Sequence, residues 1–543
     1  MRNWCQGWRH CDRQDHEAPA RSARCDDLEH SKGEMMTAKV LMVQGAMSSV
    51  GKSLMVAALC RIFRQDGWRV APFKAQNMAL NSFATRDGRE VGRAQAMQAD
   101  AAGVDVTVEM NPVLIKPEAD SFAQIVVLGK PWARLAAGEY MSRRSELWDI
   151  VTHALDSLRS QYDLVIIEGA GSPAELNLRR GDIVNMAVAE YAQAPVLLVG
   201  DIDRGGIFAQ LLGTYWLLEE HERALVRGLI VNKFRGDARL FDDGVKILEA
   251  RSGIRVLGVV PFVRDLRIAD EDSVALDNAN RVSQSASGID IAVIRLPHIS
   301  NFDDFDPLRA EADVTVRFVD RVEDIGLPDL LILPGTKTTT ADLRYLRERG
   351  LTSHIVELAH TGVPVLGICG GYQMLGETIR DPSGVESDEP EVKGLGLLPV
   401  ETTFAPDKVT TRARGSIQAQ RGLFANARGI EVTGYEIHMG QTSGRPQTRS
   451  TPLLRVIARG DDDAADDDGA VSADGMIAGT YFHGLFDNDA LRHVLLANLA
   501  ARKGWTRVTA PARFDRNAEY DRLAETVRAH LDLDEVLKIL GAT

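Results

Sequence analysis

One cysteine of the sequence stands where an apolar run meets a helical stretch, in VPVLGICGGYQMLGE at residues 363–377. Glycines close to Cys369 permit a tight, strained turn that would present the thiol at the start of the helix. The N–H groups of a helix start favour a thiolate and can bind an oxyanion. A buried cysteine without a chemical role is the alternative, but such a residue needs no glycines around it. The motif therefore predicts a catalytic nucleophile.

A nucleophilic cysteine needs a base, and the best candidate is His483 in GTYFHGLFDN, more than 100 residues downstream. This order of cysteine and late histidine resembles class I glutamine amidotransferases, in which a thioester forms on the cysteine and ammonia leaves. The loop LPGTK resembles the oxyanion loop of that family. The resemblance implies that the N–H groups of Gly335 and Gly370 stabilise the oxyanion.

Many members of that family carry a glutamate two residues after the histidine, where this chain has Leu485. The third member of the triad is therefore missing or comes from elsewhere in the chain. A Cys–His dyad can still work, because a thiol needs less activation than a hydroxyl.

A second constellation, VLMVQGAMSSVGKS at residues 40–53, joins an apolar run to a helical stretch. Gly45 and Gly51 allow the chain to wrap tightly, so that backbone N–H groups face phosphate oxygens. Lys52 would reach the outer phosphates and Ser53 would hold Mg²⁺. Five residues separate the glycines, one more than usual. This spacing resembles dethiobiotin synthetase and its relatives, which activate a carboxylate with ATP. A glycine-rich turn without a ligand would not explain Gly-Lys-Ser at the helix start.

Acidic residues follow two further apolar runs. Glu168 ends the run at 164–167 and precedes a Gly-Ala-Gly turn, where Mg²⁺ and the γ-phosphate of a nucleotide would meet. A surface or helix-capping glutamate is the alternative, but the glycines keep the approach open. Asp201 and Asp203 occupy a similar place in GDIDRGG.

The elements that must position these residues follow two α/β rhythms. From about residue 38 to 265, short apolar runs alternate with helical stretches, which is typical of a doubly wound parallel sheet. A second α/β rhythm, expected to form a class I glutamine amidotransferase-like domain, begins after a polar stretch. The predicted strands are 40–44, 70–73, 164–167, 196–199, 229–231 and 256–260 in the first part, and 289–294, 330–333, 363–368 and 476–480 in the second.

The domain boundaries follow from these rhythms and from composition. The run DDDAADDDG at 461–469 is expected to be a solvated surface loop. The first 36 residues are polar and lack a secretory apolar stretch, and their cysteines and histidines match no zinc pattern. The expected parts are a disordered N-terminal extension at 1–36, an ATP-dependent amidoligase domain at 37–270, a linker at 271–288, a glutamine amidotransferase domain at 289–505 and a C-terminal helical segment at 506–543.

The composition argues against several classes of protein. The formal net charge is −14, so broad binding of nucleic acid is not expected. No apolar run approaches the roughly 18–20 residues of a membrane span, and five cysteines in 543 residues do not suggest a disulfide framework. We therefore expect a cytoplasmic protein that binds neither nucleic acid nor membrane.

Three stretches carry a more specific resemblance. They are FKAQNMALNSFATRDGREVGRAQAMQA at 73–99, MNPVLIKP at 110–117 and YEIHMGQT at 435–442. Together with the ATP-type loop and the Cys–His pair without its glutamate, they closely resemble cobyric acid synthases over roughly residues 37–540. Cobyrinate a,c-diamide synthases, the sister branch, usually carry a Gly-Pro-Asp-Tyr-Ile-Asp-Pro motif that this chain lacks. A non-catalytic ATP switch and a stand-alone glutaminase are further alternatives, which the presence of both motifs disfavours.

The resemblance implies a reaction and a set of partners. Members of this family amidate the b, d, e and g carboxylates of adenosylcobyrinic acid a,c-diamide, a corrinoid, and use Mg²⁺, ATP and glutamine but no permanently bound cofactor. An assembly of several identical copies stays open.

The resemblance also implies roles for residues after the second strand. Lys74 would hold the substrate carboxylate or the γ-phosphate, and Asn77 and Asn81 would orient corrinoid side chains. Asp87 and Glu90 are weaker candidates for metal ligands, with a surface role as the alternative. His438 is left outside the catalytic set, because a histidine at a strand end is as often structural.

Overall fold

The structure is a computed structural model of the 543-residue chain. It describes residues 37–118, 122–264, 266–268, 288–387, 389–444, 451–507 and 514–542. The chain divides into two units, Met1–Met36 and Thr37–Thr543, and the second contains all of the described residues. The predicted extension at 1–36 and the predicted linker at 271–288, apart from Gly288, lie outside the described residues.

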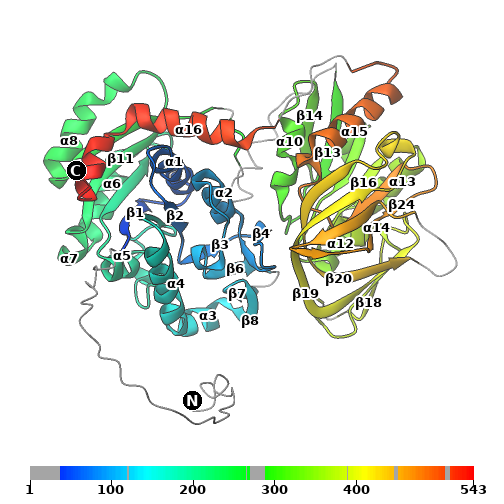
Figure 1. Cartoon of the computed structure of the whole chain (residues 1–543), viewed down its shortest axis with the longest axis horizontal. Coiled ribbons are helices and arrows are strands. Elements are labelled where there is room, and N and C mark those ends of the chain that lie inside the picture. Colours follow the sequence, from blue (N-terminus) through cyan, green and yellow to red (C-terminus); the bar gives the residue numbers. More distant parts are fainter. Residues whose placement is uncertain are drawn as a thin grey trace, which may run out of the picture. The chain divides into compact units, whose positions relative to one another are not determined.

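The first part of this unit is built on a six-stranded parallel sheet, as the sequence predicts (Figure 1). Its strand order is β12–β11–β10–β1–β9–β2, so β1, which leads into the phosphate-binding loop, lies inside the sheet between β10 and β9. The strands are β1 Lys39–Gly45, β2 Val70–Phe73, β9 Leu164–Glu168, β10 Val196–Asp201, β11 Val226–Phe234 and β12 Val256–Pro261.

Helices cover both faces of this sheet, because alternate residues of a strand point to opposite sides. Leu41 and Val43 of β1 belong to a core with α1, whereas Val40 and Met42 belong to a core with α4. The main helices are α1 Lys52–Gln65, α2 Arg93–Ala102, α4 Trp148–Gln161, α5 Met186–Ala192, α6 Ile207–Leu217 and α8 Asp242–Ser252. This is the doubly wound arrangement.

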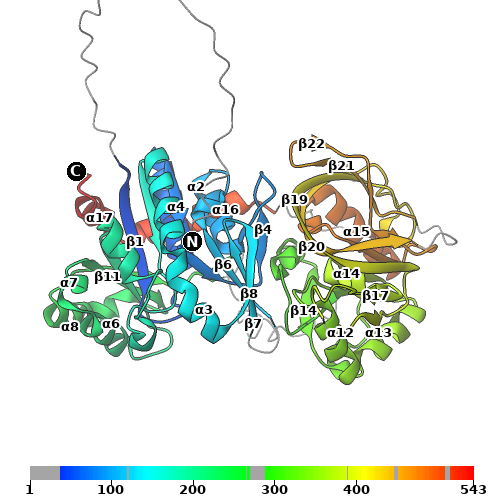
Figure 2. The ribbon, with the colours of Figure 1, turned by 90° about the horizontal axis from the view of Figure 1, so that it is seen from below.

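A small sheet and a hairpin follow β2, and the sequence analysis missed both. Three of their strands have only three residues each and are too short to show the alternation that predicts a strand. Figure 2 shows β6, β7 and β8 side by side. The small sheet has the order β3–β6–β7–β8, with β3 Gln76–Met78, β6 Val113–Pro117, β7 Phe122–Val127 and β8 Lys130–Ala136, and the hairpin consists of β4 Ser82–Ala84 and β5 Glu90–Gly92.

The second part contains another mostly parallel sheet, with the order β14–β13–β15–β16–β25–β24. Its strands are β13 Ile289–Ile294, β14 Val314–Val319, β15 Leu330–Leu333, β16 Val365–Ile368, β25 Ile477–Thr480 and β24 Ala470–Val471. Long antiparallel strands, which the sequence did not predict, form a separate sheet around β19 Val400–Ile417, β20 Glu431–Gly444 and β21 Leu454–Arg459.

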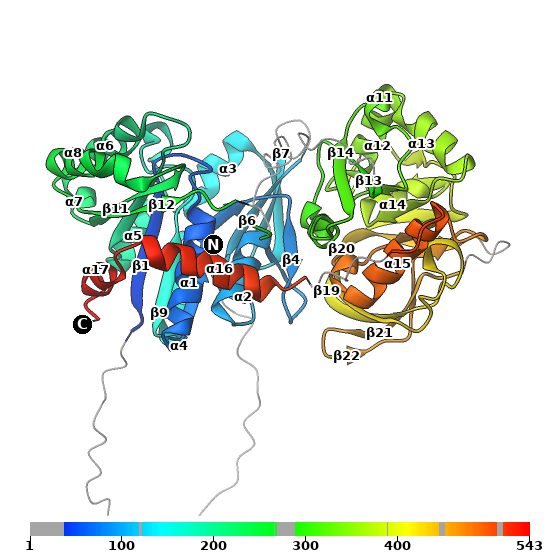
Figure 3. The same ribbon diagram turned by 90° about the horizontal axis from the view of Figure 1, so that it is seen from above.

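The end of the chain returns to the first sheet. Helix α16, Arg516–His530, lies along α1, and Figure 3 shows the two helices side by side. Asp521 accepts a hydrogen bond from Arg61 at 2.7 Å. Leu523 and Val527 are buried in the same core as Leu41, and α17, Leu533–Ile539, follows. The C-terminal helices therefore complete the core of the first part.

The acidic run at 461–469 is not wholly the solvated loop that the sequence suggested. Its short strands β22, Asp462–Asp463, and β23, Asp467–Asp468, pair with β21. Asp468 is buried and accepts hydrogen bonds from the hydroxyl of Thr480 and the N–H of Tyr481. Within the described ranges, no helix combines the length and the apolar character that crossing a bilayer requires.

Candidate active sites

Cys369 lies at the turn between β16 and α14, Gly370–Leu375, as the sequence predicted. Its φ of 51° and ψ of −109° are strained for a residue with a side chain. The following glycines make the turn possible, because a Cβ at Gly371 would lie 2.0 Å from the carbonyl oxygen of Leu333. The turn places the thiol at the N-terminal end of a helix.

His483 and Asp304 complete a triad with this thiol. His483 follows β25 and lines the same cavity as Cys369, and its Nδ1 lies 2.7 Å from Oδ2 of Asp304. The N–H of Gly484 donates to the other carboxylate oxygen at 2.8 Å. Burial opposes a charged imidazole, but Asp304 and Cys369 outweigh it and raise the pKa of His483 to about 10. The imidazolium is therefore favoured at neutral pH, where it can stabilise a thiolate.

Asp304 is the third member that the sequence analysis left open. It lies in the short helix η6, Phe302–Phe305, which follows β13 and precedes His483 by 179 residues. Leu485, at the usual position of the carboxylate, is fully buried instead. The acidic pair in NFDDFDP, within ten residues of the end of the predicted strand at 289–294, was the only signal in the sequence.

The two glycines of the predicted oxyanion hole lie close to the triad residues. A Cβ at Gly335, in the loop after β15, would lie 2.9 Å from Cε1 of His483. A Cβ at Gly370 would lie 3.1 Å from the backbone nitrogen of Thr336. The role of these N–H groups as oxyanion donors stays a prediction.

A cavity of about 60 Å³ opens in front of the thiol. Cys369, His483 and His438 line it from the second part of the unit, whereas Ser82 and Lys116 line it from the first. The ring of His438 stacks on Tyr481 at 3.8 Å, and burial lowers the pKa of His438 to about 4. His438 is therefore a neutral wall of this cavity, which we call the thiol chamber.

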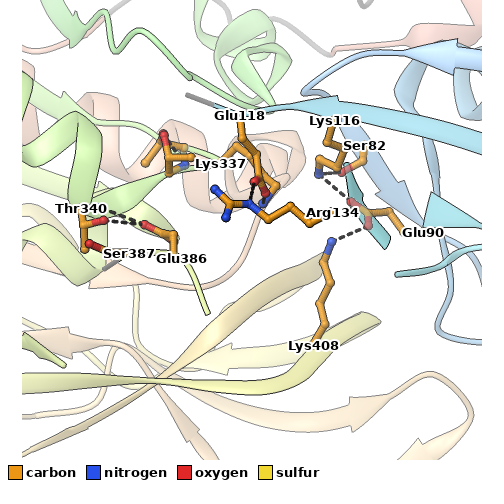
Figure 4. A network of polar contacts seen from close by, with 12 residues as sticks. Ser82, Glu90, Lys116, Glu118, Arg134, Lys337, Thr340, Glu386, Ser387 and Lys408 are labelled. Carbon is orange, nitrogen blue, oxygen red and sulfur yellow. Dashed lines mark hydrogen bonds and ion pairs between the residues drawn. The ribbon is translucent and has the colours of Figure 1, made fainter. Parts of the chain in front are cut away.

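Carboxylates of the first part form ion pairs with lysines that line the thiol chamber, and Figure 4 shows these pairs. Glu118, directly after β6, binds Lys337 of the LPGTK loop at 2.8 Å. Glu90 binds Lys116 at 2.6 Å and also binds Lys408 of β19. Although burial opposes the charged carboxylate, the two lysines hold the pKa of Glu90 well below its usual range. Burial lowers the pKa of Lys408 to about 8.

The phosphate-loop residues gather around Glu168. Ser53 Oγ donates to Glu168 Oε1 at 2.8 Å, and Lys74 Nζ lies 2.9 Å from the same oxygen. Lys52 Nζ donates to the carbonyl oxygen of Gly171 at 3.0 Å. Hydroxyl and carboxylate oxygens are the donors that Mg²⁺ prefers, so Ser53 and Glu168 fit such an ion.

Two glycines permit the conformation of the loop. Gly51 has a φ of 97°, which favours glycine, and a Cβ at Gly45 would lie 3.0 Å from Nζ of Lys52. From strand β11, which lies one strand beyond β10, Asn232 donates to the carbonyl oxygen of Val50 at 2.7 Å.

Lys233 supports the same loop from the end of β11. It binds the carbonyl oxygen of Ser49 and, at 2.9 Å, a carboxylate oxygen of Asp201. Asp203 pairs with Arg235. Asp201 thus holds Lys233 beside the loop.

A cavity of about 680 Å³ adjoins the loop. Lys52, Lys74 and Asn77 line it together with Ser49 and the buried Arg144. Its size suits a nucleotide and part of a larger substrate.

Three residues that were candidates for metal or substrate binding lie outside the nucleotide cavity. Asp87 lies in the exposed β4–β5 turn with Thr85 and Arg89 as partners, and it does not line the nucleotide cavity. Glu90 is buried between lysines, so it is neither a surface residue nor a partner of Ser53 and Glu168. Asn81 accepts a hydrogen bond from the N–H of Asn301 at 2.7 Å. It therefore joins the two parts of the unit instead of facing the cavity.

Helix α2 contacts both sites, which the sequence did not reveal. Gln98 donates to Oε2 of Glu168 at 2.5 Å. Arg93, at the start of the helix, lies 2.6 Å from Asp303, the neighbour of Asp304.

Comparisons with known proteins agree with this geometry. Residues 41–275 match the CobQ/CobB/MinD/ParA nucleotide binding domain, and residues 290–491 match the CobB/CobQ-like glutamine amidotransferase domain. The chain is 54% identical over 518 residues to the cobyric acid synthase of Sorangium cellulosum, with 93% of this chain and 99% of the relative covered. It is 51% identical over 504 residues to the cobyric acid synthase of Dehalococcoides mccartyi, with 93% and 98% covered. This chain therefore belongs to the cobyric acid synthase family of glutamine amidotransferase-type ligases.

Proposed function

We propose that this chain converts adenosylcobyrinic acid a,c-diamide to adenosylcobyric acid by amidating its b, d, e and g carboxylates. Each amidation would consume one ATP and one glutamine. The observation that carries the proposal is the presence, in one chain, of the Cys369–His483–Asp304 triad and of the Ser53–Glu168 pair beside a phosphate loop.

The triad would release ammonia from glutamine. The thiolate of Cys369 attacks the side-chain amide carbon, and the N–H groups of Gly335 and Gly370 bind the oxyanion. His483 gives its proton to the leaving nitrogen, so that ammonia departs and a thioester remains. Water then hydrolyses the thioester to glutamate. Asp304 holds the imidazole in the orientation that these steps need.

The phosphate-loop site would activate the carboxylate. A carboxylate is a poor electrophile, because its leaving group would be oxide, and phosphorylation supplies a better one. Lys52 would bind the β- and γ-phosphates, and Lys74 would orient the carboxylate towards the γ-phosphate. Mg²⁺, held by Ser53 and Glu168, would neutralise phosphate charge. Ammonia attacks the resulting acyl phosphate, and phosphate leaves with its bonding electrons as the amide forms.

The test is mass spectrometry of adenosylcobyrinic acid a,c-diamide incubated with the protein, Mg²⁺, ATP and glutamine. We expect four successive losses of about one mass unit, one for each exchange of OH for NH₂. A Cys369→Ala variant should lose this activity with glutamine and keep it with an ammonium salt.

The sister reaction, amidation of the a and c carboxylates, is the second candidate. Amidation of cobyrinic acid, with none of the diamide, would assign the protein to that reaction. Amidation of neither corrinoid would refute both proposals.

A further inference from the structure

The thiol chamber has charged walls that the triad does not use. Three lysines line it, Lys116, Lys337 and Lys408, and each is paired with a carboxylate, Glu90 or Glu118, that comes from the first part of the unit. Glu386 lies on the same cavity, in the segment between β17, Thr378–Arg380, and β18, Glu391–Lys393. The walls therefore carry groups of both signs around the space in front of Cys369.

Glu386 differs from the other carboxylates of this region, because its partners are neutral. One of its oxygens accepts hydrogen bonds from the N–H of Thr340 at 2.9 Å and from the Thr340 hydroxyl at 3.4 Å (Figure 4). Among residues 37–542, as far as the structure describes them, no basic side chain lies within ion-pair distance of Glu386. Its second oxygen is therefore available to a cation that enters the chamber.

Glutamine brings such a cation. At neutral pH it carries an α-ammonium group and an α-carboxylate, both separated by two methylene groups from the amide that Cys369 would attack. A ligand-binding cavity that matches a zwitterion needs an anion for one end and cations for the other. Glu386 is the one acidic side chain among the described residues that line this cavity, and the three lysines lie on the same walls.

We propose that Glu386 binds the α-ammonium group of glutamine and thereby sets the specificity of the thiol chamber for an α-amino acid. The inference rests on the proposed use of glutamine at Cys369. Lys337, the last residue of the predicted oxyanion loop, lies among the cations that would receive the α-carboxylate.

The electrostatics of Glu386 agree with this assignment. Burial raises the pKa of Glu386 to about 7, and the N–H of Thr340 and the charge of Lys337 only partly counter this effect. Asp381 and Asp342 raise it further. An arriving ammonium group would compensate the charge of this partly buried carboxylate, so binding and ionisation of Glu386 favour each other.

A structural role is the competing explanation, since Thr340 lies in the first turn of α12, Thr339–Glu348, and a carboxylate there stabilises a helix. The variant Glu386→Gln separates the two roles. It keeps the size of the side chain and an acceptor for the N–H of Thr340 but removes the charge. The matched control is Glu389→Gln, in the same segment, where the carboxylate is exposed and pairs with Arg344.

The experiment measures glutamate release from glutamine and deamidation of 5-amino-5-oxopentanoic acid, which is glutamine without its α-amino group. Mg²⁺, ATP and the corrinoid are present in each assay. We expect wild type to prefer glutamine strongly in kcat/KM, and Glu386→Gln to raise KM for glutamine on the order of 10- to 100-fold. The preference for glutamine over the desamino analogue should collapse in this variant only. Amidation with ammonium should be unchanged in both variants.

Equal losses for both compounds in Glu386→Gln, with the preference intact, would overturn the proposal in favour of the helix-capping role. Equal use of both compounds by wild type would overturn it even if the variant did not fold. Failure of the proposed function would look different, because wild type would then release no glutamate that depends on Cys369.

Discussion

The hydrogen bonds of Asp304 predict what its loss would do. Both carboxylate oxygens accept, one from His483 Nδ1 at 2.7 Å and the other from the N–H of Gly484 at 2.8 Å. The variant Asp304→Asn keeps the shape but has one oxygen and one NH₂ group. It can therefore satisfy only one of the two donors, and the imidazole loses either its orientation or the tautomer that serves Cys369.

The expected loss follows from one hydrogen bond to a charged group. Such a bond contributes about 1.5–3 kcal/mol, and each 1.36 kcal/mol in the barrier changes a rate about tenfold. We therefore expect kcat/KM for glutamine to fall about 10- to 150-fold. Amidation with ammonium does not pass through the triad and should stay at the wild-type rate.

The assay compares glutamate release and amide formation with glutamine or ammonium as the nitrogen source. The control is Asp306→Asn, because this carboxylate, two residues further on, is paired with Arg309 rather than with His483. Wild-type glutamate release by Asp304→Asn would refute the assignment of Asp304 to the triad. Loss of the ammonium-dependent reaction as well would show that the change acts on the fold and not on the thiol.

Three further predictions concern other parts of the chain. Glu168→Gln should lower amidation on the order of 100-fold with ammonium as well as with glutamine, because the proposed Mg²⁺ ion would lose a charged ligand; an effect with glutamine alone would contradict this role. Lys233→Gln should raise KM for ATP about tenfold and leave kcat at saturating ATP nearly unchanged, because Lys233 supports the loop through Ser49; an unchanged KM in steady-state kinetics would count against it. Burial raises the pKa of Asp468 to about 7, so the folded state binds more protons than the unfolded state between about pH 4 and pH 7. The free energy of unfolding should therefore fall as pH rises through this window. Urea denaturation should show that the free energy of unfolding changes less between pH 5 and pH 8 in Asp468→Asn than in wild type. An identical change in the two proteins would refute the raised pKa of Asp468.

The parallel sheets could be predicted because their strands are buried on both faces. The runs at 70–73 and 289–294 agree with β2 and β13 to the residue. The small sheet near β3 and the long antiparallel strands could not be predicted in the same way. Their strands are either too short for a period or half exposed and rich in charges, as in β19.

Some residues of the candidate site could likewise be predicted from the sequence, and others could not. Cys369, Lys52 and Ser53 lie in local motifs whose glycines and order along the chain indicate their geometry. Asp304 and Glu386 contribute through contacts between distant segments, and no spacing rule connects such residues in the sequence. Asp87 was a weaker candidate for a metal ligand because it follows the second strand, whereas the hairpin turns it towards solvent.

Helix α16 has a consequence for how the polypeptide can be cut or rebuilt. The first domain is discontinuous, because its core needs residues 514–542 as well as the stretch that ends near residue 268, and the amidotransferase domain is an insertion between these two segments. An N-terminal fragment that ends near residue 268 lacks α16, which leaves the apolar face of α1 uncovered. Such a fragment should therefore aggregate. A circularly permuted gene that joins α16 and α17 to the front of β1 would be the way to express the synthetase half by itself.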